Sequence, residues 1–148
     1  MSNMTSEMNR NMILIIEVDK NQYLKIGKKL KIDFKKGYYV YVGSAMNNLE
    51  SRVKRHLSKT KKLHWHVDYL LKNNEITEVI YNLDEKVECD ISQKLAKNNT
   101  FIKDFGCSDC DCESHLYYFK SKKVAIEEVK NAYSSIACPF RIGISDFS

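Results

Sequence analysis

The chain has 148 residues, enough for one domain with a single hydrophobic core. Its 24 lysines and arginines exceed its 19 aspartates and glutamates, and the net charge of +5 gives a mild bias towards anionic partners. With five glycines and one proline, long disordered linkers are not expected, and no apolar run approaches the roughly 20 residues that span a membrane.

Residues 1–11 are polar and lack both apolar periodicity and the apolar stretch of a signal peptide. We therefore expect a flexible tail followed by a single domain over residues 12–148. Without a secretion signal or a membrane span, the sequence predicts a soluble, cytoplasmic protein. The odd number of cysteines, five, then indicates reduced or metal-bound thiols in place of a disulfide framework.

Two strands are expected in the first part of the domain. The nearly continuous apolar run Met12–Val18 predicts a central strand. Residues 19–36 are polar and lysine-rich, with a strand-like stretch at Tyr23–Ile26 followed by a loop. Tyr38–Val42 is rich in strand-forming residues between two glycines and predicts the second strand.

Helices and strands alternate in the remainder of the chain. Leu49, Val53 and Leu57 recur every four residues, which predicts the buried stripe of a helix, with Asn47 or Asn48 as its N-cap. Five further elements follow in order: a helix through Leu63–Leu71, a strand at Glu75–Leu83, a helix over 85–98, a strand at Leu116–Phe119 and a helix at Val124–Tyr133. This order predicts an α/β (α+β) fold with a short, partly antiparallel sheet flanked by helices.

The second strand and the following helix bring reactive groups to one corner. Tyr41 and Gly43 end the strand, and Arg52 and His56 are four residues apart on one helix face. A phenol, a guanidinium and an imidazole suit the binding and attack of a phosphate. We also predict that the neighbouring basic run contacts nucleic acid, although a solvated lysine face is the alternative. The residues of this run are Lys54, Arg55, Lys59, Lys61 and Lys62.

These motifs resemble the GIY-YIG nuclease superfamily, and more specifically an uncharacterised prokaryotic family of GIY-YIG-like domains. Four blocks carry the resemblance, in this order: Tyr41–Ala45, Arg52–His56, His64–Leu71 and Cys107–Leu116. The resemblance extends from about Met12 to Phe119. It implies a small, mainly antiparallel three-stranded sheet flanked by helices, and a metal-dependent endonuclease that hydrolyses phosphodiester bonds in DNA, including structured or damaged DNA.

The resemblance also implies a role for each residue of the corner. Tyr41 would bind the attacking water and help to remove its proton, and Arg52 would stabilise the charge on the phosphoryl oxygens. His56 would support them as a second phosphate ligand. An acidic residue from a later helix would hold Mg²⁺ or Mn²⁺; Glu88 is the first candidate for this ligand and Asp90 the second.

One position departs from the family pattern. The family has Gly-x-Tyr at the start of the first strand, whereas this chain has Met12, whose thioether cannot act as a phenol. Tyr39, on the same strand face as Tyr41, is a candidate substitute. The departure also supports an alternative, a non-catalytic nucleic-acid-binding domain that retains the phosphate-binding corner.

A cysteine-rich segment offers a different interpretation. Four soft ligands within nine residues could bind Zn²⁺, and Cys89 could add a further thiolate. These ligands are Cys107, Cys110, Cys112 and His115. Since zinc sites usually join two ligand pairs across a long spacing, buried free thiols are the alternative. With zinc bound, the chain would be a zinc-stabilised interaction module.

A last candidate metal site contains His64, His66 and Asp68. A strand would place all three side chains on one face, whereas the helix expected here pairs only His64 with Asp68. We therefore favour the packing of Trp65 and Val67, with a hydrogen bond between a histidine and Asp68, over a metal site.

Overall fold

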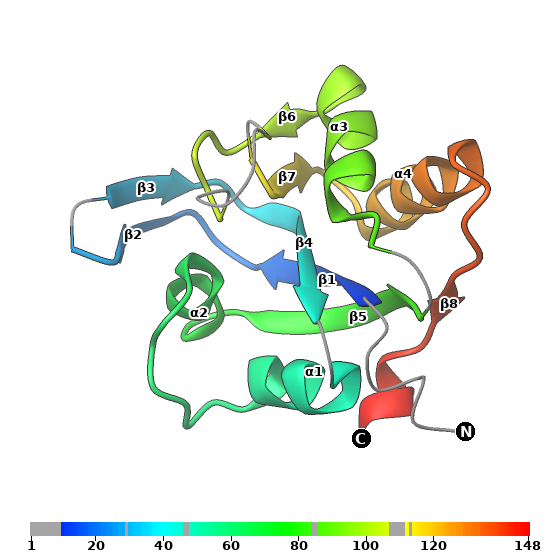
Figure 1. Ribbon diagram of the computed structural model, residues 1–148. Coiled ribbons are helices and arrows are strands. Elements are labelled where there is room, and N and C mark those ends of the chain that lie inside the picture. Colours follow the sequence, from blue (N-terminus) through cyan, green and yellow to red (C-terminus); the bar gives the residue numbers. More distant parts are fainter. Residues whose placement is uncertain (1–9, 29, 46–47, 84–85, 107–111, 113) are drawn as a thin grey trace.

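A computed structural model describes residues 10–28, 30–45, 48–83, 86–106, 112 and 114–148. Its main sheet has six antiparallel strands in the spatial order β6-β7-β4-β1-β5-β8 (Figure 1). These strands are β1 (Arg10–Val18), β4 (Gly37–Ala45), β5 (Glu75–Asn82), β6 (Thr100–Phe101), β7 (Leu116–Phe119) and β8 (Arg141–Ile142). A separate hairpin pairs β2 (Gln22–Ile26) with β3 (Leu30–Phe34).

Helices cover both faces of the main sheet. They are α1 (Leu49–Leu57), α2 (His66–Leu71), α3 (Glu88–Asn98) and α4 (Lys122–Ser135), followed by the 3₁₀ helix η2 (Ile144–Phe147). Helices α1 and α2 pack with one face of the sheet, and α3 and α4 pack with the other (Figure 1). Strand β1 lies between these two layers, and its apolar side chains are buried on both faces, which accounts for its uninterrupted apolar sequence.

The predicted α+β class is confirmed, but the expectation of a three-stranded sheet is wrong. Strands β4, β1 and β5 form the centre of a six-stranded sheet, and β7 extends it beside β4. The edge strands β6 and β8 have two residues each, which is too short to produce a periodic pattern. The expected loop after Ile26 contains β3.

The main predicted helices are present with small differences at their ends. Asn48 is the N-cap of α1, and its side chain accepts a hydrogen bond of 2.8 Å from the backbone N–H of Ser51. Strand β1 begins at Arg10, two residues before the expected start, so Arg10 and Asn11 belong to the sheet. Among the described residues, no helix combines the length and apolar character needed to cross a bilayer.

Candidate functional site

A pocket of about 600 Å³ lies at the end of β4. Its walls come from β1, β4, α1, the segment that leads into α2, the beginning of α3, the loop at 104–106 and the residue before β7. All four histidines of the chain and its single tryptophan line it, namely His56, His64, Trp65, His66 and His115. The pocket also brings together four residues that the sequence analysis assigned to one site, namely Tyr41, Arg52, His56 and Glu88.

Tyr41 forms part of the pocket wall and is 9% exposed. Burial, followed by the negative charges of Glu88 and Asp68, raises the pKa of its phenol well above the ordinary value, while Arg52 opposes this shift. The phenol therefore stays protonated near neutral pH and can donate a hydrogen bond. Because its phenolate is not populated there, Tyr41 needs a neighbouring base to take a proton from water.

Gly43 leaves room for this phenol. A Cβ atom at position 43 would lie 2.9 Å from Cε2 of Tyr41 and 3.0 Å from the methyl carbon of Met12. Both distances are too short for carbon atoms, so any side chain at position 43 would displace Tyr41, Met12 or both. The glycine after Tyr41-Val42 is thus required by the close approach of these side chains.

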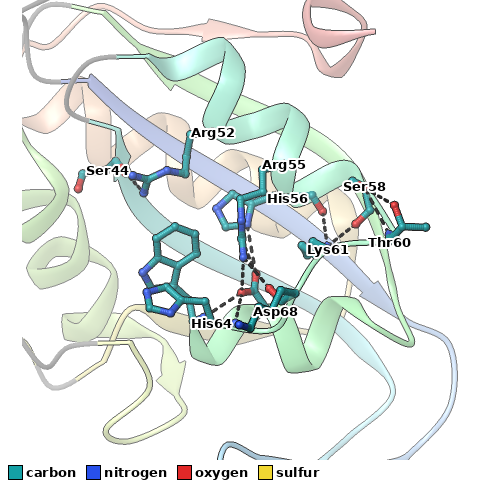
Figure 2. Close-up of polar contacts among 11 residues, drawn as sticks. Ser44, Arg52, Arg55, His56, Ser58, Thr60, Lys61, His64 and Asp68 are labelled. Atoms are coloured by element: carbon teal, nitrogen blue, oxygen red, sulfur yellow. Dashed lines mark hydrogen bonds and ion pairs between the residues drawn. The ribbon is translucent and has the colours of Figure 1, made fainter.

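Arg52 reaches from α1 to the end of β4. Its Nη1 donates a 3.1 Å hydrogen bond to the carbonyl oxygen of Ser44, and its guanidinium carbon lies 4.6 Å from the centre of the Trp65 ring (Figure 2). Together these contacts hold the guanidinium at the pocket wall. The bond to Ser44 uses one of its five N–H donors, so further donors can serve a phosphate.

His56 is 2% exposed, and neither of its ring nitrogens has a hydrogen-bond partner among the described residues. Its nearest carboxylate atom, Oδ1 of Asp68, is 3.9 Å from Nδ1. Burial lowers the pKa of His56 to about 4, and the cations Arg55, Arg52 and Lys61 add to this effect against the influence of Asp68. The ring is therefore neutral at pH 7, and a buried polar group of this kind requires an explanation such as a ligand.

Asp68 fixes the segment before α2 through four charge-assisted hydrogen bonds. Arg55 donates two of them, each of 3.0 Å, and the backbone N–H groups of His64 and Trp65 donate two of 2.8 Å (Figure 2). Burial opposes ionisation of Asp68, but Arg55 and these N–H groups outweigh it and hold the pKa below its ordinary value. The predicted hydrogen bond between a histidine and Asp68 is thus present, and His64 makes it through its main-chain N–H.

The basic run after Arg52 is largely engaged with the fold itself. Nζ of Lys59 donates to the carbonyl oxygens of Leu71 and Asn74, at 2.8 and 2.7 Å, at the end of α2. Nζ of Lys61 donates to two carbonyl oxygens at the end of α1, as Figure 2 shows. Lys54 forms an ion pair of 2.8 Å with Glu50. Of the five basic residues expected to bind nucleic acid, Lys54, Lys59 and Lys62 are exposed, and the described structure gives side-chain partners to all but Lys62.

Glu88, the first residue of α3, lies beside His115 at the pocket wall. Its Oε2 lies 4.0 Å from Nδ1 of His115, and that nitrogen lies 3.1 Å from the carbonyl oxygen of Val42. Because a carbonyl oxygen can only accept, Nδ1 of His115 carries the proton in this contact. The sequence analysis gave His115 only a zinc role, whereas its position puts it beside Glu88. Asp90 is exposed and is not part of the pocket.

Tyr39 lies outside the pocket. Its hydroxyl donates a 2.8 Å hydrogen bond to the carbonyl oxygen of Lys35, and its ring packs against Phe34 and Tyr118. The side chain is 1% exposed and belongs to the core beneath α2 and the hairpin. Met12, which pairs with Gly43 in the sheet, lines the pocket instead.

The predicted zinc site and the predicted magnesium ligand have different structural support. Cys107 and Cys110 of the predicted zinc site lie outside the described residues; of the other two, Cys112 is partly exposed and His115 is buried. Within the described ranges, no three histidine, cysteine or acidic side chains are grouped to hold a metal ion. Glu88, which lines the pocket together with a second acidic residue, Asp104, is nevertheless a suitable ligand for Mg²⁺, which usually keeps several waters and binds substrate oxygens.

Comparison with known proteins identifies a family for this domain. Residues 11–138 match the family described as Domain of unknown function DUF123, and the chain belongs to that family. The matched segment covers the elements from β1 to α4 and therefore the whole pocket. No curated protein and no solved structure matches the chain.

Proposed function

We propose that this member of the DUF123 family is a metal-dependent endonuclease of the GIY-YIG type, which hydrolyses phosphodiester bonds in DNA. The observation that carries the proposal is the gathering of Tyr41, Arg52, His56 and Glu88 around one pocket. These groups come from a strand and two helices, so their convergence is a property of the fold as well as of the local motif. The order of the sequence blocks supports the same family.

In the proposed reaction, Arg52 binds the scissile phosphate. Its guanidinium is held by Ser44 and Trp65 and retains donors that match phosphoryl oxygens. Fixed donors of this kind stabilise the charge that develops in the transition state, since they need no reorganisation at that moment. Glu88 would hold Mg²⁺ or Mn²⁺, which supplies further charge neutralisation at the phosphate and the leaving oxygen.

Tyr41 and His56 share the handling of water. The protonated phenol positions the water, and the neutral imidazole takes its proton while the water oxygen attacks phosphorus. The bond to the ester oxygen then breaks, and that oxygen takes up a proton to give a hydroxyl group and a phosphomonoester. The negative phosphate raises the pKa of His56 as it enters, which makes the imidazole a better base than it is without the phosphate.

The test is cleavage of branched, nicked and linear DNA, with RNA in parallel, in the presence of Mg²⁺ or Mn²⁺. Arg52→Met should lower the cleavage rate by about 100-fold or more, the usual effect of removing one transition-state donor. Lys54→Met is the matched control, because it removes one charge from the same helix outside the pocket. Cleavage of none of these substrates by the wild type, or equal rates for Arg52→Met and wild type, would contradict the proposal.

A second candidate is a nucleic-acid-binding domain without catalysis. Its support is Met12, which lines the pocket on the strand where the GIY-YIG signature has a tyrosine. Binding that weakens steeply with salt, without cleavage under any metal condition, would favour this candidate over the endonuclease.

A further inference from the structure

The net positive charge of the chain originates in one short segment. Residues 20–36 contain seven lysines and one acidic residue, Asp33. The remainder of the chain therefore holds 17 basic and 18 acidic residues, and its own charge is close to zero. This segment forms the hairpin β2–β3, which extends beside α2 at the edge of the molecule (Figure 1).

Period-two alternation divides the hairpin into two faces. The inner face packs Ile26 and Phe34 into the core, with Leu24, Leu30 and Ile32 partly buried beside them. The outer face presents Tyr23, which is 68% exposed, together with Lys25, Lys31 and Asp33. The exposed lysines of the segment are Lys20, Lys25, Lys28, Lys31, Lys35 and Lys36.

The lysines of the outer face lie close together and form no ion pairs with acidic residues in the described part of the chain. Lys25 and Lys31 are direct partners in the antiparallel register, an arrangement of like charges that disfavours the hairpin. The ion pairs found among the described residues involve none of the six exposed lysines. A bound polyanion would therefore relieve the repulsion and would displace only water and counterions.

The hairpin is nevertheless firmly attached. The side-chain amides of Gln22 and Asn74 exchange two hydrogen bonds, of 2.9 and 3.1 Å, which join β2 to the segment after α2. At the base, the side chain of Asn21 accepts a 2.7 Å hydrogen bond from the backbone N–H of Lys36. The apolar inner face completes the attachment, so the lysines are carried on an ordered ribbon.

Aromatic contacts join the hairpin to the pocket. The ring of Phe34, the last residue of β3, lies edge-on to Phe105 at 6.5 Å, and Phe105 lies edge-on to Tyr41 at 6.4 Å. Phe105 is flanked by Asp104 and Gly106, which both line the pocket. Helix α2, which begins at the pocket residue His66, packs against β2. The ribbon and the pocket thus share two neighbouring elements.

We propose that the outer face of β2–β3 binds the phosphate backbone of a nucleic acid whose scissile phosphate occupies the pocket. The choice of nucleic acid as the occupant rests on the proposed function, while the charge and its arrangement are independent of it. Each strand of the hairpin has five residues and is about 17 Å long, so the ribbon can follow about five steps of a duplex. The contact is independent of sequence, because lysine meets phosphate as a point charge.

The experiment compares Lys25→Gln/Lys31→Gln with a control that loses two exposed lysines from α3 and α4, Lys97→Gln/Lys123→Gln. Binding to a labelled DNA duplex of about 20 base pairs is measured against salt concentration, without divalent ions so that cleavage cannot interfere. The hairpin variant should show a slope of log K against log salt that is shallower by about 2, and at least a tenfold loss of affinity at about 0.1 M salt. The control should keep the wild-type slope.

Cleavage at saturating DNA separates this proposal from the endonuclease proposal. The hairpin variant should cut saturating DNA at the wild-type rate, because its substitutions leave the pocket intact. Equal slopes for the hairpin variant and the wild type would overturn the hairpin contact even if the DNA is cut. A wild type that binds DNA but never cuts it would overturn the endonuclease proposal. The salt slopes of the hairpin variant and the wild type would still test whether the hairpin contacts DNA. Loss of binding to anionic lipid vesicles or an acidic peptide, with DNA binding unchanged, would also overturn the contact.

Discussion

Two segments of this protein are basic in sequence, and the fold uses them in opposite ways. In residues 52–62, Arg55 is bonded to a buried carboxylate, and Lys59 and Lys61 are bonded to main-chain carbonyl oxygens. In residues 20–36, the described lysines are exposed and take part in none of the ion pairs of the described residues. A run of positive charge therefore does not reveal by itself how much of that charge a ligand can reach.

The local backbone explains the difference. Helices α1 and α2 are short, and the last carbonyl groups of any helix lack partners within it. Lys59 and Lys61 satisfy such groups. In the hairpin, the backbone groups that face the partner strand are paired through the ladder, and the lysine side chains point away from it on the outer face.

The largest expected effect tests whether the basic residues of segment 52–62 stabilise the fold. Arg55→Met should lower the free energy of unfolding by about 3 to 5 kcal/mol, because it leaves the fully buried Asp68 carboxylate without its cation. Urea unfolding at pH 7 measures the change. Lys25→Met, which removes an exposed hairpin charge, should change the stability by less than about 0.5 kcal/mol. Similar losses of unfolding free energy for Arg55→Met and Lys25→Met would contradict the claim that only the first segment is used structurally.

The next effect concerns His56, which is buried among the cations of the same segment. Its pKa is lowered to about 4, so between pH 6.5 and 4 the unfolded chain binds a proton that the folded chain does not. This histidine should therefore make the folded state lose about 2 to 3 kcal/mol of stability between pH 7 and pH 4.5. His56→Gln should remove that part of the loss in urea unfolding at the two pH values, while His64→Gln, at an exposed position, should leave it in place.

A smaller effect is expected at the end of α2. Lys59→Met should lower the free energy of unfolding by about 1 kcal/mol, because the carbonyl oxygens of Leu71 and Asn74 lose a charged donor. Thermal and urea unfolding both report this change. Lys62→Met is the matched control, since Lys62 lies exposed in the same segment, and it should be neutral.

The smallest expected effect is a gain in stability, whereas most substitutions destabilise a fold. Lys31→Glu replaces a like-charge pair with an opposite-charge pair across the hairpin and should stabilise the fold by up to about 0.5 kcal/mol. The same substitution should weaken DNA binding more than Lys31→Gln, because it adds repulsion from phosphate. Unfolding and binding measured on one preparation test both changes. A variant that is more stable and also binds as tightly as the wild type would contradict the proposed use of the hairpin.

The sequence predicted the elements that have a clear period. Strands β1, β4 and β5 and the four α-helices were expected from apolar spacing, and Tyr39 and Tyr41 were correctly assigned to one face of β4, since both belong to the same core cluster. Strand β3 was missed although Leu30–Phe34 alternates, because the lysine-rich surroundings of this segment favoured a loop. The edge strands β6 and β8 depend on pairing with their neighbours and carry no local signal.

The site was predictable where its residues are close in sequence. Tyr41, Arg52 and His56 belong to one strand-to-helix corner, and the spacing alone places them together. His115 is distant in sequence, and it reaches the pocket because its carbonyl oxygen accepts a hydrogen bond from the backbone N–H of Val42. A sequence alone does not specify that pairing. The structural role of Asp68 was also hidden, since its cation, Arg55, is 13 residues away.

The way the hairpin joins the sheet has a consequence for the history of the domain. Val18 and Gly37 are paired in the β1–β4 ladder, so the chain leaves and re-enters the sheet at directly opposite positions. The intervening residues 19–36 can therefore lengthen, shorten or be exchanged without shifting a cross-strand partner in the β1–β4 ladder. Gly37 constrains such exchange, because a Cβ atom there would lie 2.6 Å from Cε1 of Tyr118. The buried side chains of Ile26 and Phe34 are a second constraint, since they fill part of the core. A lineage can thus vary the charge on the outer face of the hairpin while the pairing of the strands beside the pocket is inherited unaltered.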